Sequence, residues 1–164
     1  MILGACGGIS GTIAEPGSEK QLLDCILAVG GSCDTDGALF RPDRILFPAA
    51  PDRKCPRGRI DVVRHVGSVR MRAHGGLIDL TLADPAVSAA TDGVTLSVVA
   101  RGPGMQGADR VDVTLLGCAP GGLFDAMRSG RSLSSTLLLT GSWIFDHRYP
   151  VGIELPPVSW SATA

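Results

Sequence analysis

The sequence predicts a mainly β protein, an antiparallel β-sandwich or barrel with one N-terminal α-helix. Three observations predict this fold class: eight short strand-like runs, turn residues between them, and a single stretch of helical periodicity. The 22 glycines and 11 prolines among 164 residues are typical of many short strands joined by turns. With 45% hydrophobic and 19% charged residues, we expect residues 1–164 to form a single globular domain.

The helix is predicted over residues 18–29, after a glycine-rich start that is expected to form a loose strand or arm. Ser18, with a glutamine three residues later, fits a capping box. Apolar residues then recur at i, i+3, i+4 and i+7, on one helix face: Leu22, Cys25, Ile26 and Val29. The glycine pair at 30–31 ends the helix. Cys25 therefore lies on the apolar face, where a free cysteine is commonly a small buried hydrophobe.

The rest of the chain has an almost entirely β pattern. The strand-like runs are residues 44–47, 59–63, 68–73, 77–83, 94–100, 111–116, 133–140 and 151–160. Turn signals such as Thr91-Asp92-Gly93 separate them, which favours an antiparallel sheet over βαβ units. Residues 121–130 are expected to form a short helix or an ordered loop.

A lone histidine stands at the mouth of one predicted hairpin. His74 closes the run 68–73, and Gly75-Gly76 follow it, where the absence of a Cβ allows a sharp turn. The next run, 77–83, is expected to stop at Asp84-Pro85. An imidazole at this place can ligate a metal or move protons, or it can simply hydrogen-bond a loop carbonyl, and the local pattern leaves both open.

Composition argues against several function classes. A net charge of −1 with scattered arginines does not suggest nucleic acid as a partner. No run reaches the roughly 20 apolar residues of a membrane span, and the start lacks a signal peptide, so we expect a cytoplasmic protein. The five cysteines form no CxxC pair, which argues against a zinc site, and their odd number argues against a complete disulfide framework within one chain.

Two separated groups of motifs carry a family resemblance. Residues 67–76 contain the turn at His74, and residues 79–85 form a leucine-rich strand that ends in Asp84-Pro85. Much later come the Tyr149-Pro150-Val151-Gly152 turn and the strand at 155–160. In this order, from Pro16 to Trp160, the chain resembles the HtaA domain family, β-rich modules of Gram-positive bacteria that capture haem at the cell surface. The resemblance implies a β-rich domain with a haem pocket.

The resemblance also implies site residues. His74 and Tyr149 match residues that the family associates with the haem pocket. The family's axial tyrosine lies in an N-terminal helix, and the matching position here holds Cys25, with Pro16 in place of a tryptophan. Cys25 is therefore the candidate metal ligand. His147 precedes Tyr149 by two, so on an extended chain both side chains point the same way, which makes His147 a candidate second pocket histidine. The alternative is that His147 lies in a surface turn.

Two functions lead at this stage, and a purely structural or adaptor role is the third alternative. In the first, haem is retained, the Cys25 thiolate is the axial ligand, and His74 hydrogen-bonds and orients it. In the second, the pocket serves a cofactor-free enzyme of isomerase or cyclase type on an apolar substrate, which the missing export signal favours. His74 would then be the acid or base, Tyr149 a hydrogen-bond donor and Cys25 a nucleophile. Either way a small molecule is the expected partner, and exposed strand edges make a homodimer an option.

Overall fold

The computed structural model describes residues 1–4, 30–41, 44–51, 62–103 and 105–160. The predicted helix at 18–29, and with it Cys25, lies outside the described residues. The strands are β1 (Ile2–Gly4), β2 (Ser32–Asp36), β3 (Leu39–Arg41), β4 (Arg44–Leu46), β5 (Val62–Arg64), β6 (Ser68–Ala73), β7 (Ile78–Ala90), β8 (Gly93–Arg101), β9 (Asp109–Leu116), β10 (Leu133–Leu137) and β11 (Glu154–Ser159). The helical segments are η1 (His74–Gly76), η2 (Pro120–Gly122), α2 (Leu123–Ser129) and α3 (Leu139–Ile144).

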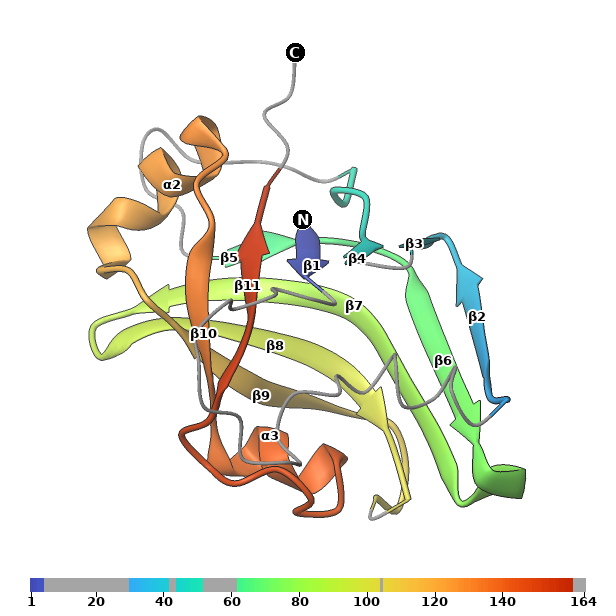
Figure 1. Ribbon diagram of the computed structural model, residues 1–164. Helices are drawn as coiled ribbons and strands as arrows, with labels where there is room; N and C mark the ends of the chain where they lie inside the picture. The colour runs from blue at the N-terminus through green and yellow to red at the C-terminus, as the bar shows by residue number, and fades with distance from the viewer. Residues whose placement is uncertain (5–29, 42–43, 52–61, 104, 161–164) are drawn as a thin grey trace, which may run out of the picture.

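These strands form one curled antiparallel sheet, a half-barrel (Figure 1), which confirms the predicted fold class. The strand order is β2-β6-β7-β8-β9-β10-β11-β1-β4-β3, and β5 pairs with β7 beside this path. The two end strands, β2 and β3, are consecutive in the chain and only Gly37-Ala38 separate them. The two edges of the sheet are therefore joined at one corner, and the sheet has to curl.

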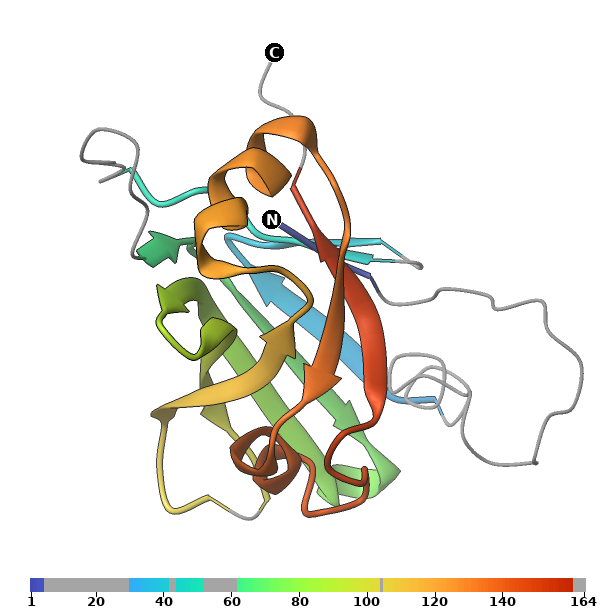
Figure 2. The same ribbon diagram turned by 90° about the vertical axis from the view of Figure 1, so that its left-hand side faces the viewer.

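The core lies on the concave side of the sheet. Along β6 the burial alternates with period two, as expected for a strand with one face toward the core and the other toward water. Val69, Val87 and Val94 are fully buried there, together with Leu133 and Leu137 of β10. The short helix α2 lies at one end of the half-barrel and α3 at the other (Figure 2).

The predicted stop at Asp84-Pro85 is wrong, because β7 continues through it to Ala90. Asp84 adopts a left-handed φ of 45°, and the register with β8 shifts between Ala83 and Ala86. This irregularity absorbs the proline, which cannot donate to the ladder. Asp84 is held in place from its backbone and its side chain: its N–H donates to the Gly67 carbonyl at 2.9 Å, and its Oδ1 accepts from the Gly67 N–H at 3.1 Å.

The predicted strand at 133–140 is right only in its first part. β10 ends at Leu137 and the chain turns into α3 at Leu139. The Leu138 N–H donates to the Val113 carbonyl, and the Thr140 hydroxyl donates to the Asp112 carbonyl, so the helix starts against the side of β9. Of the two alternatives left open for residues 121–130, a short helix or an ordered loop, the structure shows the helix, α2. Every other predicted run overlaps a strand where it is described.

Candidate functional site

His74 stands at the tip of the turn between β6 and β7, as the sequence predicts. It opens η1 with a left-handed φ of 51°, followed by Gly75 at 65° and Gly76 at 100°. A Cβ built on either glycine would meet no atom of the described residues within 4 Å, so the turn stands clear of the part of the chain that the structure describes. The imidazole is exposed and makes no hydrogen bond within the part of the chain that the structure describes.

Tyr149 lies in the connection between α3 and β11. Its ring is partly buried and packs edge-on against Phe145, with ring centroids 5.2 Å apart and an interplanar angle of 84°. Backbone hydrogen bonds tie the connection to β10, since the Gly152 N–H donates to the Leu137 carbonyl at 2.9 Å. His147 lies in an exposed turn with φ 57°, which agrees with the surface-turn alternative and not with the extended geometry that would point both side chains the same way.

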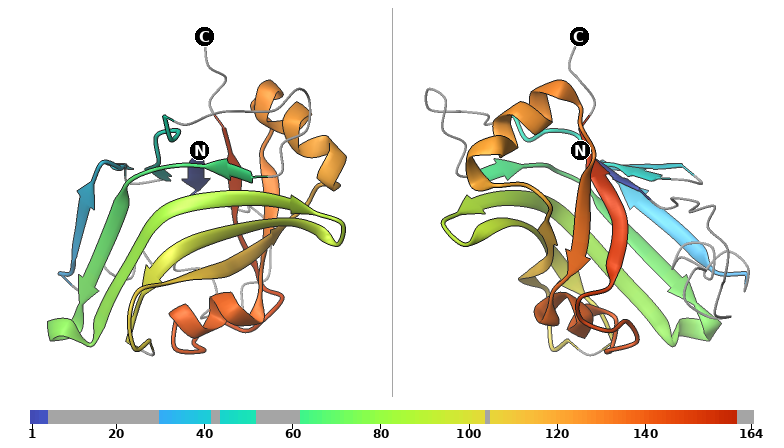
Figure 3. Two further views of the ribbon diagram at one scale, coloured as in Figure 1. Left: turned by 180° about the vertical axis from the view of Figure 1, so that it is seen from behind. Right: turned by 60° about the vertical axis from the view of Figure 1, so that its left-hand side comes forward.

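The His74 turn and the Tyr149 connection lie at the same end of the half-barrel, although 75 positions separate the two residues in sequence (Figures 1 and 3). Large apolar side chains are exposed on both segments. Leu77, directly after η1, is 76% exposed, and Val151, two residues after Tyr149, is 54% exposed. Exposed apolar side chains around a histidine and a tyrosine are a surface that an apolar ligand can cover.

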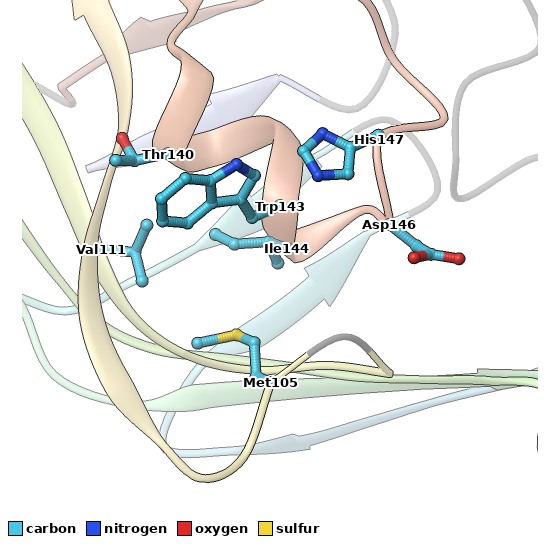
Figure 4. A pocket seen from close by; sticks show the side chains of 7 residues that line it. All are labelled: Met105, Val111, Thr140, Trp143, Ile144, Asp146 and His147. Carbon is cyan, nitrogen blue, oxygen red and sulfur yellow. The ribbon is translucent and has the colours of Figure 1, made fainter.

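His147 lines a pocket of about 280 Å³ between α3 and the end of β9, shown in Figure 4. The lining residues are Met105, Val111, Thr140, Trp143, Ile144, Asp146 and His147. Neither His74 nor Tyr149 lines this pocket, so the sequence-predicted residues do not form one cluster within the described chain. The sequence does not predict Trp143 as a pocket residue, and the one signal for it is its place in the motif segment 139–152 that suggested the family. In the structure its indole is half exposed.

Charged side chains pair across the strands next to the His74 turn. Arg70 donates two hydrogen bonds to the Asp79 carboxylate, at 2.8 and 2.6 Å, and Arg72 pairs with Asp34 at 2.6 Å. The hydrogen bond from Arg70 lowers the pKa of Asp79. These pairs lie on strands β2, β6 and β7 and hold the base of the turn in register.

The described cysteines are poor candidates for metal ligands. Burial raises the pKa of the Cys33 thiol, and the negative charge of Asp34 raises it further. Burial also raises the pKa of the Cys118 thiol, although the positive charge of Arg131 lowers it in part. Among the described residues no group of three or more histidine, cysteine, aspartate or glutamate side chains could hold a metal ion. Within the same residues, no helix has the length and apolar character of a membrane span.

The fold and this end of the sheet define a class of protein: a single-sheet β domain whose loops at one end carry a histidine, a tyrosine and exposed apolar side chains. The HtaA family model (Htaa) matches residues 27–161. The chain belongs to the HtaA family. A comparison with curated proteins finds no match.

Solved structures share the fold. The N-terminal domain of HtaA from Corynebacterium glutamicum is 18% identical, with a TM-score of 0.61 over 79% of this chain and 82% of that domain. The haem-binding protein HtaB from the same organism is 17% identical, with a TM-score of 0.58 over 79% of this chain and 76% of that one. The C-terminal domain of HtaA from the same organism is 21% identical, with a TM-score of 0.57 over 84% of this chain and 86% of that domain. A histidine-to-alanine variant of that domain forms a domain-swapped dimer.

Proposed function

We propose that this protein is a haem-binding domain, with haem held at the end of the half-barrel that carries His74 and Tyr149. The observation that carries the proposal is membership of the HtaA family over residues 27–161, a family whose fold is shared by a protein named for haem binding, HtaB. The sequence resemblance adds the residues, because His74 and Tyr149 fall on the family's pocket residues.

The described residues at this end suit a porphyrin. Haem has a large apolar face, and exposed Leu77 and Val151 offer apolar surface on the two segments that would flank it. His74 is exposed at the tip of a tight turn, where it can donate or accept a hydrogen bond next to an axial ligand. Tyr149 is oriented by the edge-on contact with Phe145. Bound haem would supply ferric iron, for which an anionic protein ligand is suitable.

The axial ligand is the part of the proposal that is particular to this chain. Cys25 occupies the position of the family's tyrosine, and we propose its thiolate as the ligand. The thiolate is the form that binds metals, and burial raises the pKa of the Cys33 and Cys118 thiols, which favours their protonated form. They provide matched cysteine controls.

A hemin titration followed by visible absorption tests the proposal. Wild type is expected to bind one equivalent with a saturable spectral change. Cys25→Ala is expected to abolish or shift the ligand-dependent band, and Cys25→Tyr to give a phenolate-type spectrum. Cys33→Ala and Cys118→Ala are expected to match wild type. His74→Ala is expected to alter the band while one equivalent still binds, because an orienting residue tunes a ligand without replacing it.

Other results separate the parts of the proposal. If Cys25→Ala leaves the spectrum of the bound haem unchanged, haem binding stands and the thiolate is wrong. If wild type shows no saturable change but Cys25→Tyr gains one, the pocket has kept its shape and lost its metal chemistry, and His74 and Tyr149 become the positions to test for enzymatic activity. If neither protein binds hemin, the haem proposal is wrong.

A further inference from the structure

We propose that the pocket lined by Trp143 and His147 binds a second ligand: a planar molecule of one or two rings that carries a hydrogen-bond acceptor such as a carboxylate. The inference does not depend on haem binding, since neither His74 nor Tyr149 lines this pocket. It rests on the shape of the pocket, on the fixed geometry of its rim, and on the proton that His147 presents.

The rim of the pocket is a rigid turn that follows α3. Asp146 and His147 both have left-handed φ angles, 52° and 57°, which are uncommon for two successive residues with side chains. Backbone hydrogen bonds hold them there: the Asp146 N–H donates to the Trp143 carbonyl at 3.1 Å, and the His147 N–H to the Ser142 carbonyl at 2.9 Å. The imidazole position is therefore set before any ligand arrives.

Ser142 determines which nitrogen of His147 carries the proton. The Ser142 side chain is buried, with only 1% exposed, and its Oγ lies 3.0 Å from His147 Nδ1. Within the described chain this nitrogen is the only partner of that hydroxyl, and a buried hydroxyl donates its proton wherever an acceptor is in reach. With Ser142 Oγ as the donor, Nδ1 accepts, and we assign the ring proton of His147 to Nε2. His147 consequently presents an N–H donor on the side of the ring away from Ser142.

The rest of the lining selects an aromatic molecule. Met105, Val111 and Ile144 form apolar walls, and the Trp143 indole, 51% exposed, offers a ring face for stacking (Figure 4). The Thr140 hydroxyl is already used by the Asp112 carbonyl. Figure 4 shows the Asp146 carboxylate directed away from Trp143, so the donor facing a ligand is the imidazole. A volume of about 280 Å³ lies just below the range of drug-sized ligands, which suits a molecule of one or two rings.

The test is an NMR titration of the hemin-free protein with 2-naphthoate as probe. The chain has two tryptophans, so two indole N–H signals are expected, and Trp143→Phe assigns them. We expect the Trp143 signal to shift saturably while the signal of the buried Trp160 stays in place. His147→Phe keeps a ring at the rim but removes the donor, and it is expected to weaken 2-naphthoate binding about tenfold.

Two comparisons make the result specific. Binding of 2-methylnaphthalene, which has no acceptor, is expected to be unchanged by His147→Phe, because only the hydrogen bond is lost. Leu139→Ala, an exposed residue of the same helix outside the pocket, is expected to leave 2-naphthoate binding unchanged. The proposal is overturned if 2-naphthoate causes no saturable shift, if the Trp160 signal moves in place of the Trp143 signal, or if His147→Phe binds 2-naphthoate as tightly as wild type does.

Discussion

At the scale of single residues, Gly67 shows how strongly one position can constrain the sheet. Its φ is 108°, and a Cβ built on it would lie 2.7 Å from both the Ala38 nitrogen and the Gly37 carbonyl carbon. Gly67 thus packs directly against the corner that joins β2 to β3, and it exchanges hydrogen bonds with Asp84 on β7. A side chain here would push apart the corner on which the curl of the sheet depends.

Gly67→Ala is therefore expected to destabilise the protein by about 3 kcal/mol, because backbone strain adds to a steric clash. Gly107→Ala is the matched control: no atom lies within 4 Å of its Cβ position, and a change within about 0.5 kcal/mol is expected. Urea unfolding of wild type and of the two variants gives the free energies of unfolding to be compared. Equal stabilities of the two variants would contradict the close packing at Gly67.

The Arg70–Asp79 pair predicts a pH dependence with a definite sign. Because the pKa of Asp79 is lowered from its ordinary value of 3.8, the pair stabilises the fold above that pH. This stabilisation is lost as the pH falls through the lowered folded-state pKa. Asp79→Asn should therefore melt slightly below wild type at pH 7, and the difference should disappear in acid.

Melting temperatures measured from pH 7 downward test this dependence. Asp109→Asn is the control, because Asp109 makes no ion pair with any described residue. A melting difference between wild type and Asp79→Asn that stays constant down to the lowest pH would show that the carboxylate charge is not the cause.

At the scale of elements, the sequence predicts those turns and strands that a local residue pattern determines. It does not predict strand and helix boundaries that depend on contacts between residues far apart in the chain. The turn at His74 is correct because a strand pattern followed by two glycines determines it locally. The continuation of β7 past Pro85 could not be predicted, because it depends on Asp84 bonding to Gly67. The start of α3 was missed for the same kind of reason, since Leu138 and Thr140 find their partners on β9.

The boundary between β10 and α3 gives a matched pair of leucines. Leu137 is 1% exposed at the end of β10, whereas Leu139 is 54% exposed at the start of α3. Leu137→Ala is expected to cost about 2–5 kcal/mol of unfolding free energy, because it leaves a cavity in the core. Leu139→Ala is expected to cost less than about 0.5 kcal/mol. Denaturant unfolding compares them, and a similar loss for both would contradict the boundary.

At the scale of the whole molecule, the curl of the sheet brings together segments that are far apart in sequence. The resemblance to the family pointed to His74 and Tyr149, and the fold puts their segments at one end of the half-barrel. The pocket at Trp143 could not be predicted, because it depends on two successive left-handed residues and on a buried serine. No periodicity in the sequence encodes such a turn.

The central claim is that haem binds at the end of the half-barrel formed by η1 and the connection between α3 and β11. Anomalous diffraction at the iron absorption edge, from crystals of the hemin-saturated protein, tests it most directly. We expect one iron peak between the turn of His74 and the connection that carries Tyr149. An iron peak elsewhere, such as beside α2 or along the edge of β2, would contradict the claim, as would the absence of any peak at saturating hemin.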